Sequence, residues 1–494
     1  MSRQDFNLNR EFKMLIDGEW VDAAAGKTFT CVDPYTEESW GSIPAADAVD
    51  VDRAVQAARR AFDTGGWPQT PPAKRAALLR RLGQLIQENV DALTEQTVME
   101  NGRLVSEMIH GTASVAGACN YYAGLAETFH GLTLPVSVPN MVSYTLREPI
   151  GVVAAITPWN TPLVLLGLKL LPALAAGNTV VIKPSEYTPT STLLLAELIM
   201  EAGFPGGVVN VVTGFGDPAG MALVAHPGVD KIAFTGSTVT GKKIAQTAAE
   251  RNARVSLELG GKSPNIIFAD ADLDNAVNGA LAGVYSATGQ ACMAGSRVLI
   301  ESSVYDEVAQ RMAATASKLI PGDPLDPNTQ LGPLASRMQY EKVLGYFDIA
   351  KQEKIEVLTG GRALDRKGFY VAPTVFGNVD NSCRVAREEI FGPVASLLRF
   401  DDEEQAVALA NDTTYGLAAG IWTENLRRAH RLVPRLRAGT VWVNNYRLVS
   451  LAVPFGGYKQ SGVGREMGPE ALNEFTEVKS VWIDTGNKVQ FKAG

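Results

Sequence analysis

Cys292 stands in surroundings suited to a nucleophile. It lies in the segment GQACMAGS (289–296), where small residues on both sides leave room for a substrate to approach. A cysteine thiolate attacks carbonyl carbon and forms covalent intermediates. An isolated cysteine is more often a small buried hydrophobic residue, and we interpret Cys31, Cys119 and Cys383 in that way. For Cys292 the flanking residues favour catalysis.

Two other side chains could assist a nucleophilic cysteine. Glu258 lies between two leucines at the end of a β-branched run, where desolvation would raise its pKa and make it a candidate general base. Asn160 follows another β-branched run, and its amide could donate a hydrogen bond to an oxyanion. An asparagine at such a place is also typical of a plain turn.

Two glycine-rich segments compete as a phosphate-binding loop. GFGDPA (214–219), which contains Gly216, fits the loose dinucleotide-binding pattern but lacks the acidic residue expected about twenty positions later. FTGSTVTG (234–241) offers Gly236 for close backbone approach, the Ser237 hydroxyl and the free N–H groups of a helix N-terminus. Each segment alone is equally compatible with an ordinary strand-to-helix turn capped by Ser or Thr.

The segment KPSE (183–186) places a cation three residues before a carboxylate. Glu186 could accept hydrogen bonds from both ribose hydroxyls of an adenosine, and it would repel a 2′-phosphate, which favours NAD over NADP. Lys183 and Glu186 could equally form a solvated ion pair.

The elements around these residues alternate between strands and helices. Five β-branched runs predict strands at 151–156, 179–183, 208–212, 231–234 and 255–259. Helical patterns separate them around 162–175, 189–203, 217–225 and 238–250. This alternation predicts right-handed crossovers and a mostly parallel sheet, with ligands bound beyond the carboxyl ends of the strands.

The rest of the chain extends this α/β pattern. Residues 14–44 predict short strands and hairpins, and residues 46–127 predict three helical stretches. A second α/β series runs from 265 to about 443. A final strand at 478–484 could pair with 142–147 outside the two large units, and its edge would invite pairing with another subunit.

Composition narrows the class of protein. The chain has 494 residues, which at ~150 residues per domain suggests roughly three domains. Four scattered cysteines and four histidines without ligand spacing argue against a disulfide scaffold and a metal enzyme. A net charge of −8 disfavours nucleic-acid binding. The apolar stretch 163–182 is interrupted by Lys169 and Pro172, so we expect a buried helix, a turn and a strand there, and no membrane span. The polar N-terminus shows no secretory signal, and we expect a cytoplasmic protein.

Taken together, the motifs resemble those of the aldehyde dehydrogenase superfamily over essentially the whole chain. The matching segments, in order, are PWN (158–160), KPSE (183–186), FTGST (234–238), ELGGKSP (258–264), GQAC (289–292), EEIFGP (388–393) and PFGGYKQSG (454–462). The resemblance implies a Rossmann-variant cofactor domain (1–129 and 149–258), a second α/β catalytic domain (259–465) and a small β oligomerisation element (130–148 and 476–494). It also implies a homodimer or homotetramer.

The resemblance also implies a mechanism. Cys292 would attack an aldehyde to give a thiohemiacetal, with the Asn160 amide and the Cys292 backbone N–H stabilising the oxyanion. Hydride transfer to NAD (NADP being possible) would leave a thioester, and water activated by Glu258 would hydrolyse it to the acid. Lys169 and Glu466 match a family pair suspected of relaying protons, although a structural salt bridge would look the same.

The resemblance assigns cofactor and substrate contacts as well. It places pyrophosphate at the FTGST segment and leaves Gly216 bordering the adenine. The implied cofactor-binding residues are Ile156, Thr157, Pro158, Trp159, Lys183, Ser185, Glu186, Gly216, Phe234, Gly236, Ser237, Thr240, Leu259, Gly260, Glu389 and Phe391. The implied substrate-lining residues are Val164, Leu168, Met293, Arg447, Val449 and Phe455. Arg447 is the unusual member: it could pair with a carboxylate on the substrate, or it could be a solvated surface arginine.

Three other activities fit parts of the sequence. A CoA-acylating relative would pass the acyl group to a thiol, but that route does not need Glu258 as a water-activating base. A cysteine hydrolase would use only the thioester half of the chemistry, and the cofactor segments argue against it. A non-catalytic structural relative would not need Cys292, Glu258 and Asn160 together.

Overall fold

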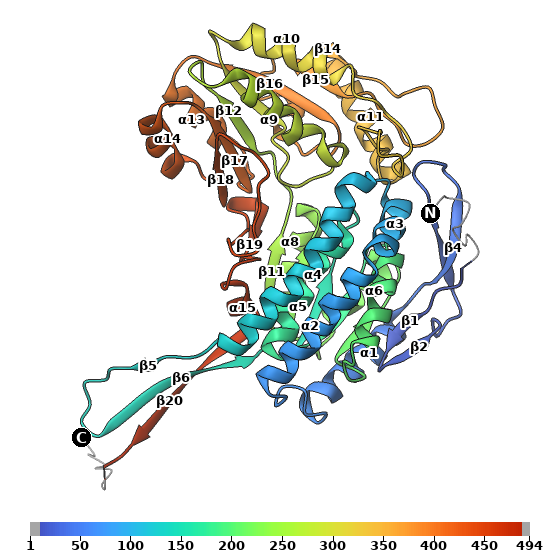
Figure 1. The fold of residues 1–494 in the computed structure, drawn as a ribbon, viewed down its shortest axis with the longest axis vertical. Coiled ribbons are helices and arrows are strands. Elements are labelled where there is room, and N and C mark those ends of the chain that lie inside the picture. Colours follow the sequence, from blue (N-terminus) through green and yellow to red (C-terminus); the bar gives the residue numbers. More distant parts are fainter. Residues whose placement is uncertain (1–9, 487–494) are drawn as a thin grey trace.

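The computed structural model describes residues 10–486, and within them the α/β class is confirmed. Residues 1–9, which carry most of the N-terminal segment considered for a secretory signal, lie outside the described residues. So do residues 487–494 of the predicted oligomerisation element. Figure 1 shows two α/β units, one above the other, with a narrow β arm extending from the lower one.

The lower unit is built on an eight-stranded sheet with the five predicted strands at its centre. Its order is β19 (Gly462–Val463), β11 (Arg254–Glu258), β10 (Lys231–Thr235), β7 (Val152–Ile156), β8 (Thr179–Lys183), β9 (Val209–Val211), β1 (Met14–Ile16) and β2 (Glu19–Val21). The stretch from β11 to β9 is parallel, while β19 and β1 add to its edges in antiparallel pairing. The carboxyl ends of the central strands therefore meet at one edge of the sheet.

Helices cover both faces of this sheet. The helices of this unit are α1 (Ala48–Asp63), α2 (Pro72–Glu88), α3 (Val90–Asn101), α4 (Val105–Thr128), α5 (Pro162–Ala176), α6 (Thr190–Glu201), α7 (Met221–Ala225) and α8 (Thr238–Ala249). Among them, α2, α3 and α4 pack mainly on other helices. The apolar stretch 163–182 forms α5, a left-handed turn at Gly177 and β8, as expected. No helix within residues 10–486 is long and apolar enough to cross a membrane.

The prediction of three helical stretches in 46–127 is wrong, because the chain forms four helices there. The additional break falls at Asn89, which has no glycine or proline beside it. Asn89 leaves helical geometry (φ −115°, ψ 19°), and both its backbone N–H and its side-chain amide donate to the carbonyl of Leu85. A short polar side chain that caps the preceding turn can end a helix without any stronger sequence signal.

The upper unit contains the second predicted α/β series as a seven-stranded sheet. Its order is β14 (Glu356–Thr359), β15 (Thr374–Gly377), β16 (Val394–Phe400), β13 (Arg297–Glu301), β12 (Pro264–Ile267), β17 (Ala418–Trp422) and β18 (Thr440–Val443). All neighbours are parallel except β14 and β15. Its helices are α9 (Leu273–Tyr285), α10 (Tyr305–Ala316), α11 (Arg337–Gln352), α12 (Arg384–Arg387), α13 (Glu403–Asn411) and α14 (Leu426–Leu432).

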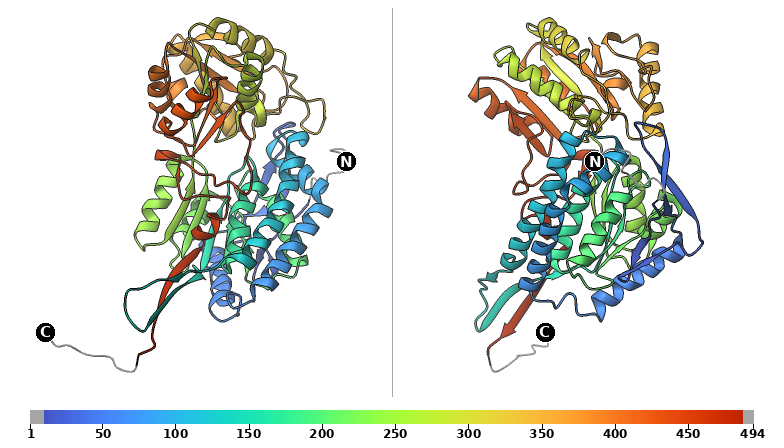
Figure 2. Two further views of the ribbon diagram at one scale, coloured as in Figure 1. Left: turned by 60° about the vertical axis from the view of Figure 1, so that its left-hand side comes forward. Right: turned by 45° about the vertical axis from the view of Figure 1, so that its right-hand side comes forward.

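The arm confirms the predicted pairing of the last strand with the segment around 142–147. β20 (Thr476–Asp484) pairs antiparallel with β6 (Met141–Pro149), and a short β5 (Thr133–Leu134), which the sequence reading missed, adds to the other edge of β6. The views in Figure 2 show this ribbon projecting away from the body. The chain enters the arm from α15 (Ala471–Glu474). The predicted hairpins in 14–44 are β1 with β2 and β3 (Thr28–Val32) with β4 (Ser39–Pro44).

Candidate active site

Cys292, Glu258 and Asn160 line one cavity between the two units. The cavity is bounded by Pro158, Trp159, Asn160, Leu165, Thr235, Gly236, Ser237, Glu258, Leu259, Gly260, Cys292, Met338, Gln339, Lys342, Glu389 and Phe391. Asn160 follows β7 and Glu258 ends β11, so the parallel lower sheet brings both to the same edge. Cys292 comes from the loop between α9 and β13 of the upper unit. Residues that are far apart in the sequence thus meet at the junction of the two units.

A strained loop holds Cys292 in place. Ala287, Thr288 and Gly289 all adopt left-handed backbone conformations, with φ between 52° and 70°. A Cβ on Gly289 would lie 2.0 Å from the carbonyl oxygen of Gly392, so this close approach requires glycine. Such strain persists only where the surrounding structure enforces it, and it clusters at functional sites.

The thiol of Cys292 is protonated at rest at neutral pH. Desolvation, with a smaller contribution from the nearby carboxylates of Glu389 and Glu258, raises its pKa to about 12. The positive charge of Arg447 acts in the opposite direction. A base must therefore take the thiol proton when Cys292 attacks.

The side-chain amide of Asn160 is held by one hydrogen bond and keeps one free N–H group. Its Nδ2 donates one hydrogen bond of 2.9 Å to the carbonyl oxygen of Gln290, which leaves the second N–H available. The backbone N–H of Cys292 donates to no acceptor within residues 10–486. Two donors therefore remain near the thiol for a developing oxyanion.

Glu258 is a buried carboxyl without hydrogen-bond partners. It is 5% exposed, and neither carboxyl oxygen accepts a hydrogen bond within the described part of the chain. Desolvation raises its pKa well above the ordinary value, and the charge of Glu466 raises it further, while Lys169 lowers it. A carboxyl with a raised pKa suits general-base catalysis near neutral pH.

The predicted Lys169–Glu466 pair is present behind Glu258. Lys169 Nζ donates to a carboxyl oxygen of Glu466 and, at 2.6 Å, to the hydroxyl of Thr235. Both side chains are buried, and the charges of both act on Glu258. This geometry is common to a structural ion pair and to a proton relay.

The second glycine-rich segment forms the turn from β10 into α8. Ser237 is the N-cap of α8, and its hydroxyl oxygen accepts a hydrogen bond of 3.2 Å from the backbone N–H of Thr240. Gly236 and Ser237 line the cavity, so the free N–H groups of the first turn lie beside it. At the end of β7, Ile156 and Thr157 are buried, and the hydroxyl of Thr157 has no hydrogen-bond partner in residues 10–486. Phe234 is buried in β10.

A second groove adjoins this cavity through Met338, which lines both. It is lined by Phe29, Thr30, Cys31, Val32, Glu37, Glu186, Tyr187, Phe215, Ala335, Ser336, Arg337, Met338 and Phe369. The carboxylate of Glu186 accepts no hydrogen bond within the described residues and forms no ion pair with Lys183. Lys183 is buried and donates only to the Pro184 carbonyl, at 2.9 Å. Ser185 accepts a hydrogen bond from Tyr187, and a Cβ at Gly216 would meet open space.

Glu389 and Phe391 project into the cavity from the upper unit. Glu389 accepts a hydrogen bond of 2.8 Å from the backbone N–H of Gly261, which follows the cavity-lining Gly260. The ring of Phe391 packs edge-on against Trp159, with centroids 5.3 Å apart. Desolvation raises the pKa of Glu389, and the charges of Lys342 and Lys262 oppose that shift.

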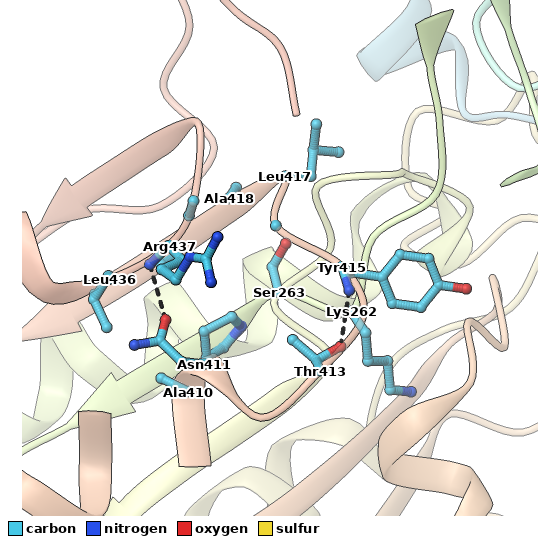
Figure 3. A pocket seen from close by; sticks show the side chains of 14 residues that line it. Lys262, Ser263, Ala410, Asn411, Thr413, Tyr415, Leu417, Ala418, Leu436 and Arg437 are labelled. Carbon is cyan, nitrogen blue, oxygen red and sulfur yellow. Dashed lines mark hydrogen bonds between the residues drawn. The ribbon is translucent and has the colours of Figure 1, made fainter. Parts of the chain in front are cut away.

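Lys262 is a buried cation behind the ELGGKSP segment. Its ammonium has no hydrogen-bond partner within residues 10–486, and desolvation lowers its pKa to about 7. Figure 3 shows it in a small pocket beside Thr413 and Tyr415. Sequence reasoning placed Lys262 inside a motif but assigned it no role; its electrostatic effect on Glu389 is visible only in the structure.

The predicted substrate-lining residues separate into two groups. Leu168, Phe455 and Met293 pack in one apolar cluster with Cys292. Val164 packs instead against the main core, and Val449 is 47% exposed. Arg447 donates a hydrogen bond to the carbonyl of Ser286, in the loop that leads to Cys292.

Five cavity residues were not among the site residues predicted from the sequence: Leu165, Thr235, Met338, Gln339 and Lys342. Thr235 lies inside the FTGST segment, between two residues that were predicted. Leu165 could have been found, because it lies one helical turn before Leu168 on α5. Met338, Gln339 and Lys342 lie on α11 of the upper unit, and nothing in their spacing points to the first sheet. Their place depends on how the two units meet.

Comparisons with known proteins agree with this geometry. Residues 20–481 match the model of the aldehyde dehydrogenase family. DhaS of Bacillus subtilis (strain 168) is 50% identical over 473 residues, which cover 96% of this chain and 95% of DhaS. Retinal dehydrogenase 2 of Mus musculus is 44% identical, covering 96% of this chain and 92% of that protein. The NAD+ complex of an aldehyde dehydrogenase from Bacillus cereus superposes with a TM-score of 0.96 at 45% identity, covering 98% of this chain and 99% of that chain.

Proposed function

Because this chain belongs to the aldehyde dehydrogenase family, we propose that it oxidises an aldehyde to the carboxylic acid with NAD, through a thioester on Cys292. The observation that carries the proposal is the single cavity shared by Cys292, Glu258 and Asn160. The similarity to an NAD+ complex supports the choice of cofactor. We propose that the lower unit binds the cofactor (1–129 and 149–258), that the upper unit carries the catalytic cysteine (259–465, apart from β19, which pairs in the lower sheet), and that 130–148 with 476–494 form the oligomerisation element.

The residues present fit a dinucleotide. The α8 N-terminus with Gly236 and Ser237 suits a pyrophosphate. The unpartnered carboxylate of Glu186 in the adjoining groove suits the adenosine ribose, with Lys183 beside it and Gly216 bordering the adenine. Glu389 and Phe391 would hold the nicotinamide ribose, and the remaining contacts come from Ile156, Thr157, Pro158, Trp159, Ser185, Phe234, Thr240, Leu259 and Gly260. When bound, NAD supplies the hydride acceptor for the oxidation.

In the first step, Cys292 adds to the aldehyde carbon. Its sulfur forms the C–S bond while its proton passes to a nearby base, and Glu258 is the candidate because its pKa is raised in the same cavity. The carbonyl oxygen becomes an oxyanion that the free N–H of Asn160 and the backbone N–H of Cys292 stabilise. Loss of hydride from the thiohemiacetal carbon re-forms the carbonyl and leaves a thioester.

Before the second step, the proton taken from the thiol must leave Glu258, and the Lys169–Glu466 pair is its proposed route. In the second step, the freed carboxylate of Glu258 takes a proton from water as the water oxygen attacks the thioester. The C–S bond breaks, the acid leaves and the sulfur of Cys292 recovers a proton. The buried Lys169–Glu466 pair, whose charges act on Glu258, would return the proton from Glu258 toward solvent. The balance is one aldehyde, one water and one NAD+ converted into acid, NADH and a proton.

The preference for NAD over NADP rests on Glu186. Its carboxylate has no cation bound to it within residues 10–486, so a 2′-phosphate there would meet an uncompensated negative charge. Replacing Glu186 with Gln should raise the relative use of NADP by about tenfold, because one repulsive contact is worth roughly 1–2 kcal/mol in a partly exposed site.

The arm supports assembly into a homodimer or homotetramer. Within residues 10–486, β20 has one unpaired edge, and Val478, Trp482 and Ile483 on this strand are 44–56% exposed. An exposed apolar strand edge is a ready partner for a second copy. Light scattering should give a multiple of the monomer mass, and Trp482→Glu should lower that mass. We also propose a cytoplasmic location, which the four unpaired cysteines favour.

An aldehyde panel assayed by the absorbance of NADH and NADPH tests the proposed activity. Oxidation of aldehydes with NAD, lost in Cys292→Ser, is the expected result. A CoA-dependent rate would instead identify an acylating enzyme. Ester hydrolysis without any aldehyde oxidation would identify a cysteine hydrolase, and no turnover at all would leave a structural relative.

A further inference from the structure

Arg447 is tied to the loop that carries Cys292 by one hydrogen bond of its own and one made by its neighbour. It follows β18, and its neighbour Tyr446 donates a hydrogen bond of 3.0 Å from its hydroxyl to the carbonyl of Met293, next to Cys292. Arg447 Nη1 itself donates to the carbonyl of Ser286 at 3.1 Å, in the loop that leads to the cysteine. The guanidinium is therefore tethered to the cysteine loop, and its charge is close enough to lower the pKa of the Cys292 thiol.

The charge of Arg447 has no ion-pair partner in the part of the chain that the structure describes. Glu107 is the acidic residue whose charge acts most strongly on the pKa of Arg447, but its carboxylate already accepts hydrogen bonds from other groups. It accepts two hydrogen bonds from Arg103 (2.8 and 3.2 Å) and others from the backbone N–H of Ala287. Desolvation lowers the pKa of Arg447, the charge of Arg103 adds to that shift, and the charge of Glu107 opposes it.

Arg103 contacts the segment that carries Asn160. Its Nη1 donates to the hydroxyl of Thr161 at 2.9 Å, directly after Asn160. The surroundings of Cys292 on this side thus hold two guanidinium groups and one carboxylate, Glu107. These three groups carry one net positive charge, while the carboxylates of Glu389 and Glu258 also act on Cys292. Leu168, Met293 and Phe455 pack with Cys292 in the apolar cluster.

The backbone at Arg447 adopts a conformation that is unusual for arginine. Its φ of 69° lies in the left-handed region, which glycine and asparagine adopt far more readily than arginine. Only Nη1 makes a hydrogen bond among residues 10–486, so Nε and Nη2 keep free donors. An anchored guanidinium with free, adjacent donors is suited to bidentate binding of a carboxylate.

Resting on the proposed oxidation of aldehydes, we propose that Arg447 binds the carboxylate of the substrate, so that this enzyme prefers ω-oxo acids to uncharged aldehydes. The carboxylate supplies the charge that Glu107 cannot, because Arg103 and Ala287 already occupy it. The apolar residues near Cys292 then contact the methylene chain between the two ends of the substrate.

Steady-state kinetics with matched substrates test this assignment. ω-Oxo acids of three to six carbons are compared with their methyl esters, which have the same chain without the charge. The wild-type enzyme should favour the acid of the best chain length over its ester. In Arg447→Met, the acid-to-ester ratio of kcat/KM should fall about 10- to 100-fold, which corresponds to the binding free energy of a hydrogen-bonded pair of charged groups. Arg447→Lys should restore part of the ratio, because it keeps the charge but not the fork.

The results of these kinetic measurements distinguish a failure of the role of Arg447 from a failure of the proposed dehydrogenase function. Oxidation of acid and ester with equal kcat/KM by the wild type, or equal losses for both in Arg447→Met, would overturn the role of Arg447 but leave the dehydrogenase intact. Oxidation of neither would overturn the proposed function itself. Arg362→Met is a matched control, since Arg362 is an exposed arginine that also donates only to a carbonyl, and it should keep the wild-type ratio.

A binding measurement covers the case in which Arg447→Met folds poorly. The Cys292→Ser variant keeps Arg447 but lacks the nucleophile. Its thermal midpoint should rise with 4-oxobutanoate and much less with the methyl ester. Equal shifts with both compounds would contradict the proposal.

Discussion

Asn160 and Gln290 join the two units across the active-site cavity through one hydrogen bond, 2.9 Å from Asn160 Nδ2 to the carbonyl of Gln290. Gln290 is held in turn by the backbone N–H of Ala335, which donates to its side-chain oxygen at 2.9 Å. The amide that we propose as oxyanion donor is thus oriented by the same segment that carries Cys292. Donor and nucleophile therefore keep their relative position.

Asn160→Ala should lower kcat by ~10²–10³, the usual cost of removing one oxyanion donor. Because the backbone N–H of Cys292 remains, activity should persist above background. Stopped-flow measurement of NADH formation would check this. The exposed Asn120, whose amide donates only to a carbonyl of its own helix, provides a control: Asn120→Ala should retain wild-type kcat. A loss below threefold in Asn160→Ala would contradict the assignment.

Glu258→Gln should separate the two halves of the reaction. The thioester should form more slowly than in the wild type, because Glu258 also takes the thiol proton, and it should hydrolyse more slowly still. NADH should therefore appear as a slowed burst of up to one equivalent per active site, followed by a slower phase. General-base catalysis contributes ~10²–10⁴, which sets the expected fall in the steady-state rate. Mass spectrometry of the quenched protein should show acylated Cys292. Full steady-state turnover without acylation would show that another group activates water.

Alkylation of Cys292 without cofactor should depend steeply on pH. Desolvation raises the pKa of the thiol to about 12, so the thiolate fraction should grow about tenfold per pH unit from pH 7 to 10. Iodoacetamide labelling followed by peptide mapping measures the rate. Glu258→Gln removes a carboxylate that raises this pKa and should speed labelling at a fixed pH. A rate that levels off below pH 9 would mean that the resting thiol is already ionised.

Lys262→Met should change how stability depends on pH. Burial lowers the pKa of Lys262 from 10.5 to about 7, so between these values the unfolded chain binds a proton that the folded protein does not. The wild type should therefore gain stability as pH rises from 7 to 10.5, by up to about 1.4 kcal/mol per pH unit from this group. Below pH 7 both states are protonated and the cost of burying the ammonium is fully present.

Lys262→Met lacks that titration. Its advantage in thermal midpoint over the wild type should be greatest near pH 6.5 and should shrink by pH 9.5. The exposed Lys318 serves as the control, and Lys318→Met should follow the wild-type profile. A constant difference between Lys262→Met and the wild type across that range would mean that Lys262 stays charged in the fold.

Much of the fold could be predicted from local patterns in the sequence. The central strands β7, β8, β9, β10 and β11 were predicted to within about two residues, because each is an apolar run bounded by clear turn residues. The break at Asn89 was missed, because it depends on one side-chain hydrogen bond. The third strand of the arm was missed, because two residues are too few to make a pattern.

The sequence by itself determined which residues could do the chemistry: motifs identified Cys292, Glu258 and Asn160, since their side-chain types and neighbours are local properties. Only the tertiary structure decided how they act. It placed Cys292 opposite Glu258, left both oxygens of Glu258 without partners, and moved the pKa values of both through burial. It also showed that, among residues 10–486, Arg447 forms no ion pair and that Glu107 is bound by Arg103 instead. Desolvation and charge pairing depend on distances across the fold, and those distances arise only when the two units meet.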